Sequence, residues 1–252
     1  MKKILSILLV AALVVCFAFT LVACNKNKDT TESFTLTEDE LKTTLSTLQN
    51  DLSSNVTTFR TVITTKSTTD EGTATQNKDV YSVKDTGIWW DNTATNPDGS
   101  SIRTLNVNTG SNHFYAEFLN GSEISAKTAY YTSFNQEYRS ISALRKESGC
   151  LEAVEFLSNI SNYSLKDIKG TNYKHEGNIV KTVYSCSYND GDLESLSSSD
   201  NGILSVTVEN NKITEIYYKT ANYENTTKYV YEFENPDFPN DVMEWFDRYP
   251  MA

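Results

Sequence analysis

Hydrophobic positions follow three patterns along the chain, and each pattern predicts a different kind of element. Residues 4–19 form an almost unbroken apolar run behind two lysines. After a polar stretch, leucines recur at spacings of four, three and four from Leu41 to Leu52, which is the period of one helix face. From Val56 onward, short β-branched and aromatic runs separated by turn residues predict strands.

Three helices are expected after the apolar run. The first begins with Thr37-Glu38-Asp39-Glu40, a capping box with a hydroxyl at the N-cap and a carboxylate three residues later. In the middle of the chain, an apolar and aromatic stripe predicts a helix over residues 130–144. Residues 148–149 interrupt this pattern, and a short helix is expected over residues 151–160.

The strands are expected in two groups, one on each side of the middle helices. The first group covers residues 56–65, 74–84, 87–93, 101–107 and 112–119, and the second covers residues 179–188, 204–208, 213–220 and a last strand from Tyr229 to Phe233. Residues 209–212 predict a tight hairpin, because asparagine tolerates the left-handed conformation that such a turn needs. Short connections between strands favour antiparallel neighbours. The expected fold class is therefore α+β, with a single antiparallel sheet that packs against helices on one face.

The start of the chain has the composition of a secretory leader, with a charged beginning, an apolar run and small Ala23 before Cys24. An uncleaved membrane-spanning helix is the alternative, since the run is nearly long enough to cross the hydrocarbon core. Leu21-Val22-Ala23-Cys24 resembles the bacterial lipobox, after which a lipoprotein signal peptidase cuts before a diacylated cysteine. The resemblance implies a mature chain that begins at Cys24 and is held by acyl chains, such as palmitate, on the extracytoplasmic face of a bacterial cell membrane.

Three parts of the chain follow from these patterns. Residues 1–23 are the expected signal peptide, residues 24–36 the lipidated cysteine and a flexible polar tether, and residues 37–252 a single domain. The aromatic-bearing tail from Asp237 onward has enough apolar surface to dock on this domain.

The net negative charge of the chain argues against anionic binding partners. With 22 basic and 33 acidic residues the net charge is -11, and loss of the two leader lysines makes it -13. Phosphates would repel such a domain, so nucleic acid is not an expected partner. Anionic headgroups would not hold the folded body either, so membrane attachment would depend on the acyl chains at about 0.8 kcal/mol per buried methylene.

The sequence carries no recognised catalytic or metal-binding motif. The two histidines, His113 and His175, have no companion at metal spacing, and residues 189–194 lack the ligand spacing of a calcium loop. A Gly-x-Ser-x-Gly elbow and a glycine-rich phosphate loop are both missing. We therefore expect neither an enzyme nor a cofactor. Cys150 and Cys186 form either one disulfide or two buried thiols.

The order of helix, strands, two helices and strands resembles the LolA-like carriers and the related mycobacterial lipid-binding lipoproteins. That resemblance implies a half-open barrel. In such a barrel one strongly curved sheet wraps around the helices and leaves an apolar cavity between sheet and helices. Aromatic side chains on the strands and on the middle helix would line this cavity, although the same side chains could fill a packed core. The candidate lining residues are Trp89, Tyr130, Phe134, Tyr138, Tyr229, Tyr231 and Phe233.

Three functions fit this sequence, and the least favoured is an envelope hydrolase that would rely on a clustered acid and base. The first is a membrane-anchored protein that binds or carries a lipid-like or apolar small molecule between sheet and helices. The second is an envelope scaffold with a packed interior, which docks a protein partner through its sheet edges or faces.

Overall fold

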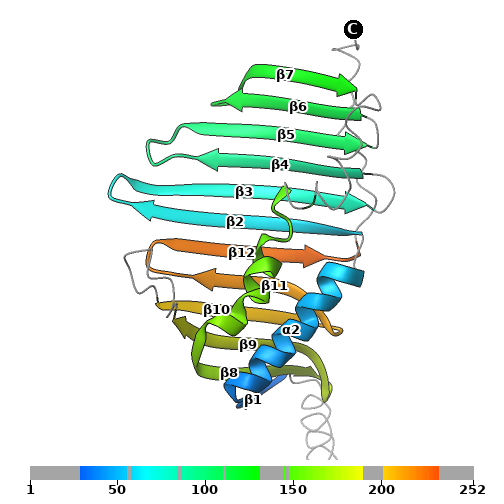
Figure 1. Ribbon diagram of the computed structural model, residues 1–252, viewed down its shortest axis with the longest axis vertical. Coiled ribbons are helices and arrows are strands. Elements are labelled where there is room, and N and C mark those ends of the chain that lie inside the picture. The colour runs from blue at the N-terminus through cyan, green and yellow to red at the C-terminus, as the bar shows by residue number, and fades with distance from the viewer. Residues whose placement is uncertain are drawn as a thin grey trace, which may run out of the picture.

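The computed structural model describes residues 29–55, 58–83, 87–109, 112–130, 145, 148–189 and 201–232. Within these ranges the strands form one antiparallel sheet in the order β1-β8-β9-β10-β11-β12-β2-β3-β4-β5-β6-β7 (Figure 1). β1 and β7 are its two edges, so the sheet stays open. The α+β class, with one open antiparallel sheet and helices on one face, is confirmed.

Most of the predicted strands are present with shifted ends. In chain order the strands are β1 (Thr30–Phe34), β2 (Phe59–Thr69), β3 (Gly72–Val83), β4 (Gly87–Thr95), β5 (Ser101–Thr109), β6 (Asn112–Leu119), β7 (Ser122–Tyr130), β8 (Ser164–His175), β9 (Asn178–Asn189), β10 (Asn201–Glu209), β11 (Lys212–Lys219) and β12 (Tyr223–Val230). The predicted hairpin joins β10 to β11, where Asn210 and Asn211 have φ of 50° and 60°.

Two predictions at strand ends are wrong. Tyr130, expected to begin a helix, is the last residue of β7. The last strand ends at Val230, so Tyr231 follows the strand instead of belonging to it. The remainder of the predicted helix, residues 131–144, lies outside the described residues, as do Phe233 and the tail from Asp237.

The first predicted helix is α2 (Glu38–Asn55), and its capping box is formed. The Thr37 backbone N–H donates to Glu40 Oε2 at 2.8 Å, and the Glu40 N–H donates to Thr37 Oγ1 at 3.3 Å. Leu41, Leu45 and Leu52 are buried. The leucine stripe therefore faces the sheet, as its spacing predicted.

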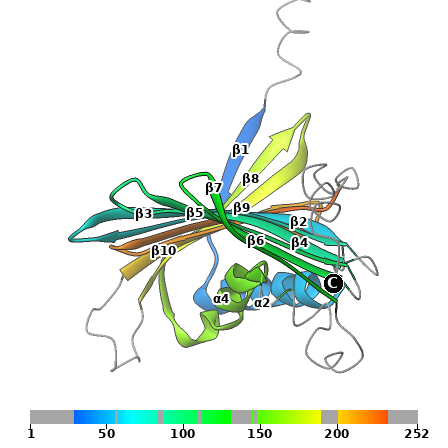
Figure 2. The same cartoon turned by 90° about the horizontal axis from the view of Figure 1, so that it is seen from above.

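The second mid-chain helix is α4 (Glu152–Ser158), which a 3₁₀ turn, η2 (Ile160–Asn162), follows. Figure 2 shows α2 and α4 side by side on one face of the sheet. We call this face the inner face and the opposite one the outer face. The main core lies between the inner face and the two helices, and its members include Leu41, Leu45, Phe59, Val80, Trp90, Leu157, Ile216 and Tyr229.

Residues 30–34, expected to belong to the flexible tether, instead form edge strand β1 on β8. The Phe34 ring lies over Gly170, where an added Cβ would be 2.2 Å from Phe34 Cζ, and it meets Tyr184 edge-on at 6.3 Å. Glu32 and Lys174 form an ion pair across the same two strands. These contacts fix a segment whose composition alone is that of a linker.

None of the helices that the structure describes has the length and hydropathy needed to cross a membrane. The predicted leader and Cys24 lie outside the described residues.

Candidate functional site

The space under α2 and α4 is filled by side chains. Tyr229 is only 2% exposed, and its hydroxyl donates to the Cys150 carbonyl oxygen at 3.3 Å. Burial raises the pKa of the Tyr229 phenol well above its ordinary value. The Tyr231 hydroxyl donates to the Ile213 carbonyl oxygen. Two of the candidate lining residues thus have their hydroxyls bound to backbone, and Tyr229 belongs to a packed core.

Trp89 was wrongly expected to line the inner cavity. Side chains alternate along β4, so that Trp90 joins the core on the inner face and Trp89 lies on the outer face. There Trp89 packs against Tyr81, with ring centroids 4.7 Å apart. The role of Tyr130, Phe134, Tyr138 and Phe233 as lining residues stays a prediction, since their side chains are not described.

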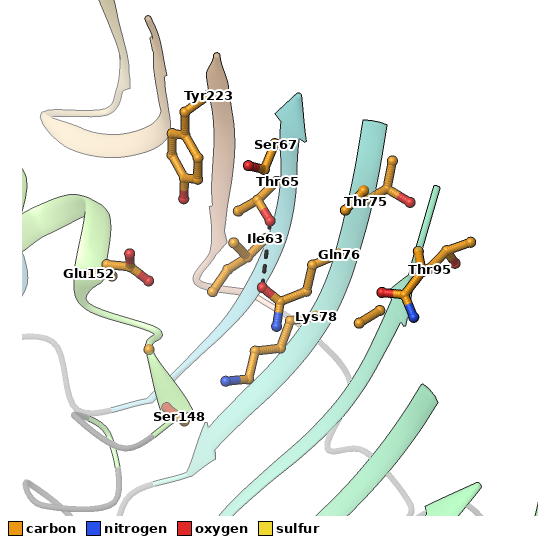
Figure 3. Close-up of a pocket in the computed structure, with 14 residues that line it drawn as sticks. Ile63, Thr65, Ser67, Thr75, Gln76, Lys78, Thr95, Ser148, Glu152 and Tyr223 are labelled. Atoms are coloured by element: carbon orange, nitrogen blue, oxygen red, sulfur yellow. Dashed lines mark hydrogen bonds between the residues drawn. The ribbon is translucent and has the colours of Figure 1, made fainter. Parts of the chain in front are cut away.

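A pocket of about 590 Å³ opens on the inner face beside the packed core (Figure 3). We call it the β2–β4 pocket, because those three strands form its floor. The strand residues that line it are Ile63, Thr65, Ser67, Ala74, Thr75, Gln76, Lys78, Ala94, Thr95 and Asn96. Ser148, Gly149 and Glu152 at the start of α4 form one wall, together with Tyr223 of β12. Most of this lining is polar, in contrast to the apolar cavity that the sequence predicted.

The chain pattern explains the change from packed core to polar pocket. Inward positions of β2 are Phe59, Thr61 and Ile63 where the helices cover the strand, and Thr65 and Ser67 beyond them. The sequence shows this change from larger to smaller and more polar side chains at every second position. The β-branched content of residues 56–65 predicts a strand but does not distinguish its buried end from its polar end.

Two opposite charges flank Gly149 at the wall of the β2–β4 pocket. A Cβ added to Gly149 would lie 3.6 Å from Glu152 Oε2 and 3.8 Å from Lys78 Nζ. The Lys78 ammonium also lies 5.7 Å from the centroid of the Trp90 ring, a cation–π distance. Gly149 has a φ of +70°, a conformation that favours glycine, and this keeps the space between the two charges open.

Neutral polar groups border the same pocket. Thr65 Oγ1 donates to Gln76 Oε1 at 3.5 Å across β2 and β3 (Figure 3). Asn225 lies directly opposite Thr65 on β12 and is 1% exposed. Its Oδ1 accepts a hydrogen bond from Thr227 Oγ1 at 2.8 Å, while its Nδ2 has no hydrogen-bond partner among the described residues. A buried donor without a partner lowers the stability of the fold, so an asparagine at this buried position has an energetic cost.

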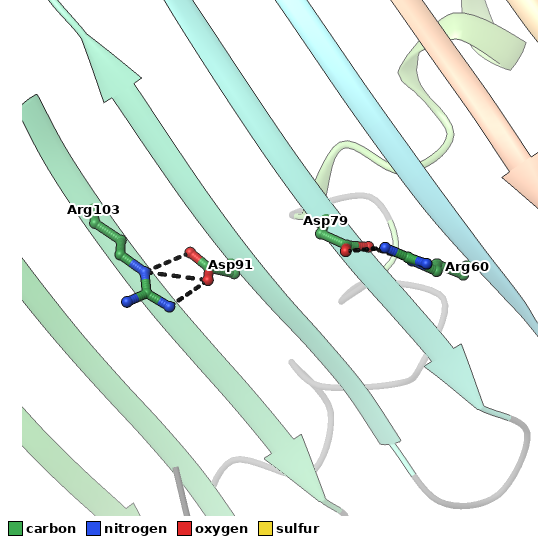
Figure 4. Close-up of polar contacts among 4 residues, drawn as sticks. All are labelled: Arg60, Asp79, Asp91 and Arg103. Carbon is green, nitrogen blue, oxygen red and sulfur yellow. Dashed lines mark hydrogen bonds and ion pairs between the residues drawn. The ribbon is translucent and has the colours of Figure 1, made fainter. Parts of the chain in front are cut away.

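The outer face carries a row of charges across β2 to β5 (Figure 4). Asp79 and Asp91 stand directly opposite each other on β3 and β4. Arg60 binds Asp79 through two hydrogen bonds of 2.9 and 2.6 Å, and Arg103 binds Asp91 at 2.5 to 3.1 Å. A smaller pocket of about 240 Å³ lies here between Trp89 and the two aspartates. The charge of Asp79 is thus neutralised by an arginine on β2, and that of Asp91 by an arginine on β5.

The cysteines are free thiols, so the disulfide alternative is wrong. Cys150 contacts Tyr229 of β12, whereas Cys186 lies on β9, and two strands separate β9 from β12. Three strand spacings amount to roughly 14 Å, which is too far for a disulfide. Burial raises the pKa of each thiol to about 11. Among the described residues, no cluster of His, Cys, Asp and Glu is arranged to bind a metal ion.

No known family model matches this chain, and no curated protein matches it either. Among solved structures, it is similar to LprF from Mycobacterium bovis, with 9% identity and a TM-score of 0.43 over 81% of this chain and 99% of that one. A putative outer membrane lipoprotein-sorting protein domain from Vibrio parahaemolyticus matches at 9% identity and a TM-score of 0.27, over 80% and 97% of the two chains. A LolA superfamily protein from Nitrosomonas europaea has 9% identity and a TM-score of 0.25, over 82% and 97%.

Proposed function

We propose that this chain is an extracytoplasmic lipoprotein, anchored by acyl chains on Cys24, that binds a lipid-like amphiphile at the β2–β4 pocket. The observation that carries the proposal is the pocket itself, which opens between the inner face of the sheet and the start of α4. Its volume of about 590 Å³ is within the range of small-molecule sites, about 300 to 1,000 Å³.

The position of β1 supports a ligand from the membrane. Only residues 25–29 separate Cys24 from the first residue of β1, and such a segment spans at most about 20 Å when extended. A domain on so short a tether stays close to the bilayer surface. Lipids would then be among the most concentrated small molecules near the domain.

The test is lipid retention by the mature chain. A Cys24→Ser variant, secreted in soluble form, would be purified without detergent and analysed by native mass spectrometry and by organic extraction. We expect one bound lipid per chain, and binding of added lipid to the emptied protein. A protein that carries no lipid and binds no added fluorescent lipid would contradict the proposal.

The scaffold function remains the second candidate, because the core under the helices is packed and some apolar side chains of the sheet are exposed to solvent. Ile179, Val180 and Ile203, on β9 and β10, are about half exposed. Crosslinking in cells separates the two functions, since a carrier gives lipid adducts at the pocket whereas a scaffold gives one dominant protein partner at these strands.

A further inference from the structure

We infer that the β2–β4 pocket recognises a compact zwitterion of the phosphoethanolamine kind, in which an ammonium group and a phosphate are joined by two carbons. This inference rests on the proposed function, since it names the chemistry that the same pocket would take. The group could be part of a membrane lipid or a free water-soluble molecule, and the experiment distinguishes these sources.

The first argument is the pairing of charges across a small gap. Lys78 Nζ and Glu152 Oε2 both lie within 4 Å of the position that a Gly149 side chain would occupy. An ammonium ion placed near Glu152 and a phosphate placed near Lys78 would each meet an opposite charge. A neutral molecule would gain from neither contact, and a plain anion would be repelled by Glu152.

The second argument is that the lysine has a fixed environment. The face of the Trp90 ring lies beneath the Lys78 ammonium, and Trp90 itself is buried in the core. A cation held on an aromatic face loses less freedom when a ligand binds than an exposed lysine does. Lys78 is therefore placed to bind an anionic group at this wall of the pocket.

The third argument concerns a neutral group in the same pocket. Ser67 lines the pocket on the inward side of β2, and its hydroxyl can donate to a phosphate oxygen.

The few apolar lining residues limit what else can enter. Ile63, Ala74 and Ala94 are the apolar side chains at the strand floor. An acyl chain would therefore bury little apolar surface against the described lining, whereas it would displace water from many polar groups. The chemistry of the pocket thus favours the headgroup of an amphiphile over its tail.

The experiment measures binding of two probes to the full mature chain that carries Cys24→Ser. Glycerophosphoethanolamine tests the free headgroup by calorimetry, and flotation with phosphatidylethanolamine vesicles tests the lipid, with phosphatidylglycerol vesicles as the anionic comparison. Lys78→Gln and Glu152→Gln each remove one charge and leave a side chain of similar size to the original. Lys166→Gln on β8 and Glu155→Gln on α4 are matched controls at exposed positions outside the pocket.

We expect each pocket variant to weaken binding of the zwitterion at least tenfold and each control variant to change it less than twofold. Circular dichroism and thermal melting confirm that every variant is folded. Binding that weakens on Lys78→Gln but not on Glu152→Gln overturns the zwitterion in favour of a simple anion.

The remaining outcomes separate this inference from the proposed function. Equal binding of both lipids, unaffected by either pocket variant, overturns the zwitterion but leaves a lipid-binding protein. Binding of glycerophosphoethanolamine with no binding of any lipid supports the zwitterion and contradicts the lipid ligand. Binding of neither probe overturns the inference, and it contradicts the proposed function as well if no lipid is retained.

Discussion

At the scale of single residues, the outer face places two negative charges where a sheet ordinarily avoids them. Like charges directly opposite on antiparallel strands destabilise the pair, yet Asp79 and Asp91 occupy such positions on β3 and β4. Arg60 and Arg103 approach from the two flanking strands and bind one carboxylate each (Figure 4). The four residues therefore act as one unit across β2 to β5.

This arrangement predicts a specific pattern of stabilities. Arg103→Gln leaves Asp91 without its cation and opposite Asp79, and we expect it to lower the free energy of unfolding by about 1 kcal/mol. Adding Asp91→Asn to that variant removes the repulsion, so the double variant should be more stable than Arg103→Gln alone. Urea denaturation of the three proteins checks this order. A double variant that is less stable than Arg103→Gln would contradict it.

Single residues also show why the site was only partly predictable. Lys78 lies in a polar stretch of β3 and resembles any solvated strand lysine. It faces inward only because the register pairs it with Ile63 of β2 and Asn92 of β4. Glu152 comes from a helix far along the chain. No local sequence pattern predicts that these two charges lie on either side of Gly149, because only tertiary packing places them there.

At the scale of elements, β1 shows a strand that tertiary contacts create. Its sequence, Thr30–Phe34, is polar except at the last position, and its pairing with β8 depends on the fit of Phe34 over Gly170. Even a methyl group at residue 170 would overlap the phenyl ring. The docking of this edge strand therefore relies on the absence of a side chain at one position.

A double-mutant cycle tests this dependence. We expect Gly170→Ala to destabilise β1 by about 1 to 3 kcal/mol, because the new methyl group forces the Phe34 ring away from Gly170 and Tyr184. In a Phe34→Ala background the same change should cost much less. Amide hydrogen exchange of residues 30–34 reports the local effect. Equal costs in both backgrounds would show that the Phe34 ring is not the reason for the glycine.

The elements also differ in how well the sequence predicted them. The helix from residue 38 was predicted correctly, because its capping box and leucine spacing are local signals. Besides β1, the sequence missed β7 and β8, which have weak apolar alternation, and β8 carries several lysines. Hydrogen bonds to neighbouring strands hold these segments extended, although their own side-chain patterns do not predict it. Strand boundaries near Tyr130 and Val230 were wrong for the same reason.

At the scale of the whole molecule, the proposed acyl anchor on Cys24 would give the sheet a direction relative to the membrane. β1 lies at one edge of the sheet and β7 at the other (Figure 1). Strands are spaced by about 4.8 Å, so these edges are roughly 50 Å apart. With acyl chains on Cys24, a tether of at most about 20 Å to Thr30 would keep the first edge near the bilayer, and a sheet standing on that edge would hold the β7 edge away from it.

This geometry predicts different distances from the membrane for two exposed turns. A fluorophore on Asn178→Cys, in the hairpin next to β1, should transfer energy strongly to acceptor-labelled lipids, whereas one on Ser122→Cys, beside β7, should transfer weakly. The native thiols should stay unlabelled, since both are buried with a pKa of about 11. A flexible insertion before Asp29 should reduce transfer at Asn178→Cys, because it lengthens the tether. Equal transfer from the two positions would mean that the sheet lies flat on the membrane, and the anchor would then not orient the domain.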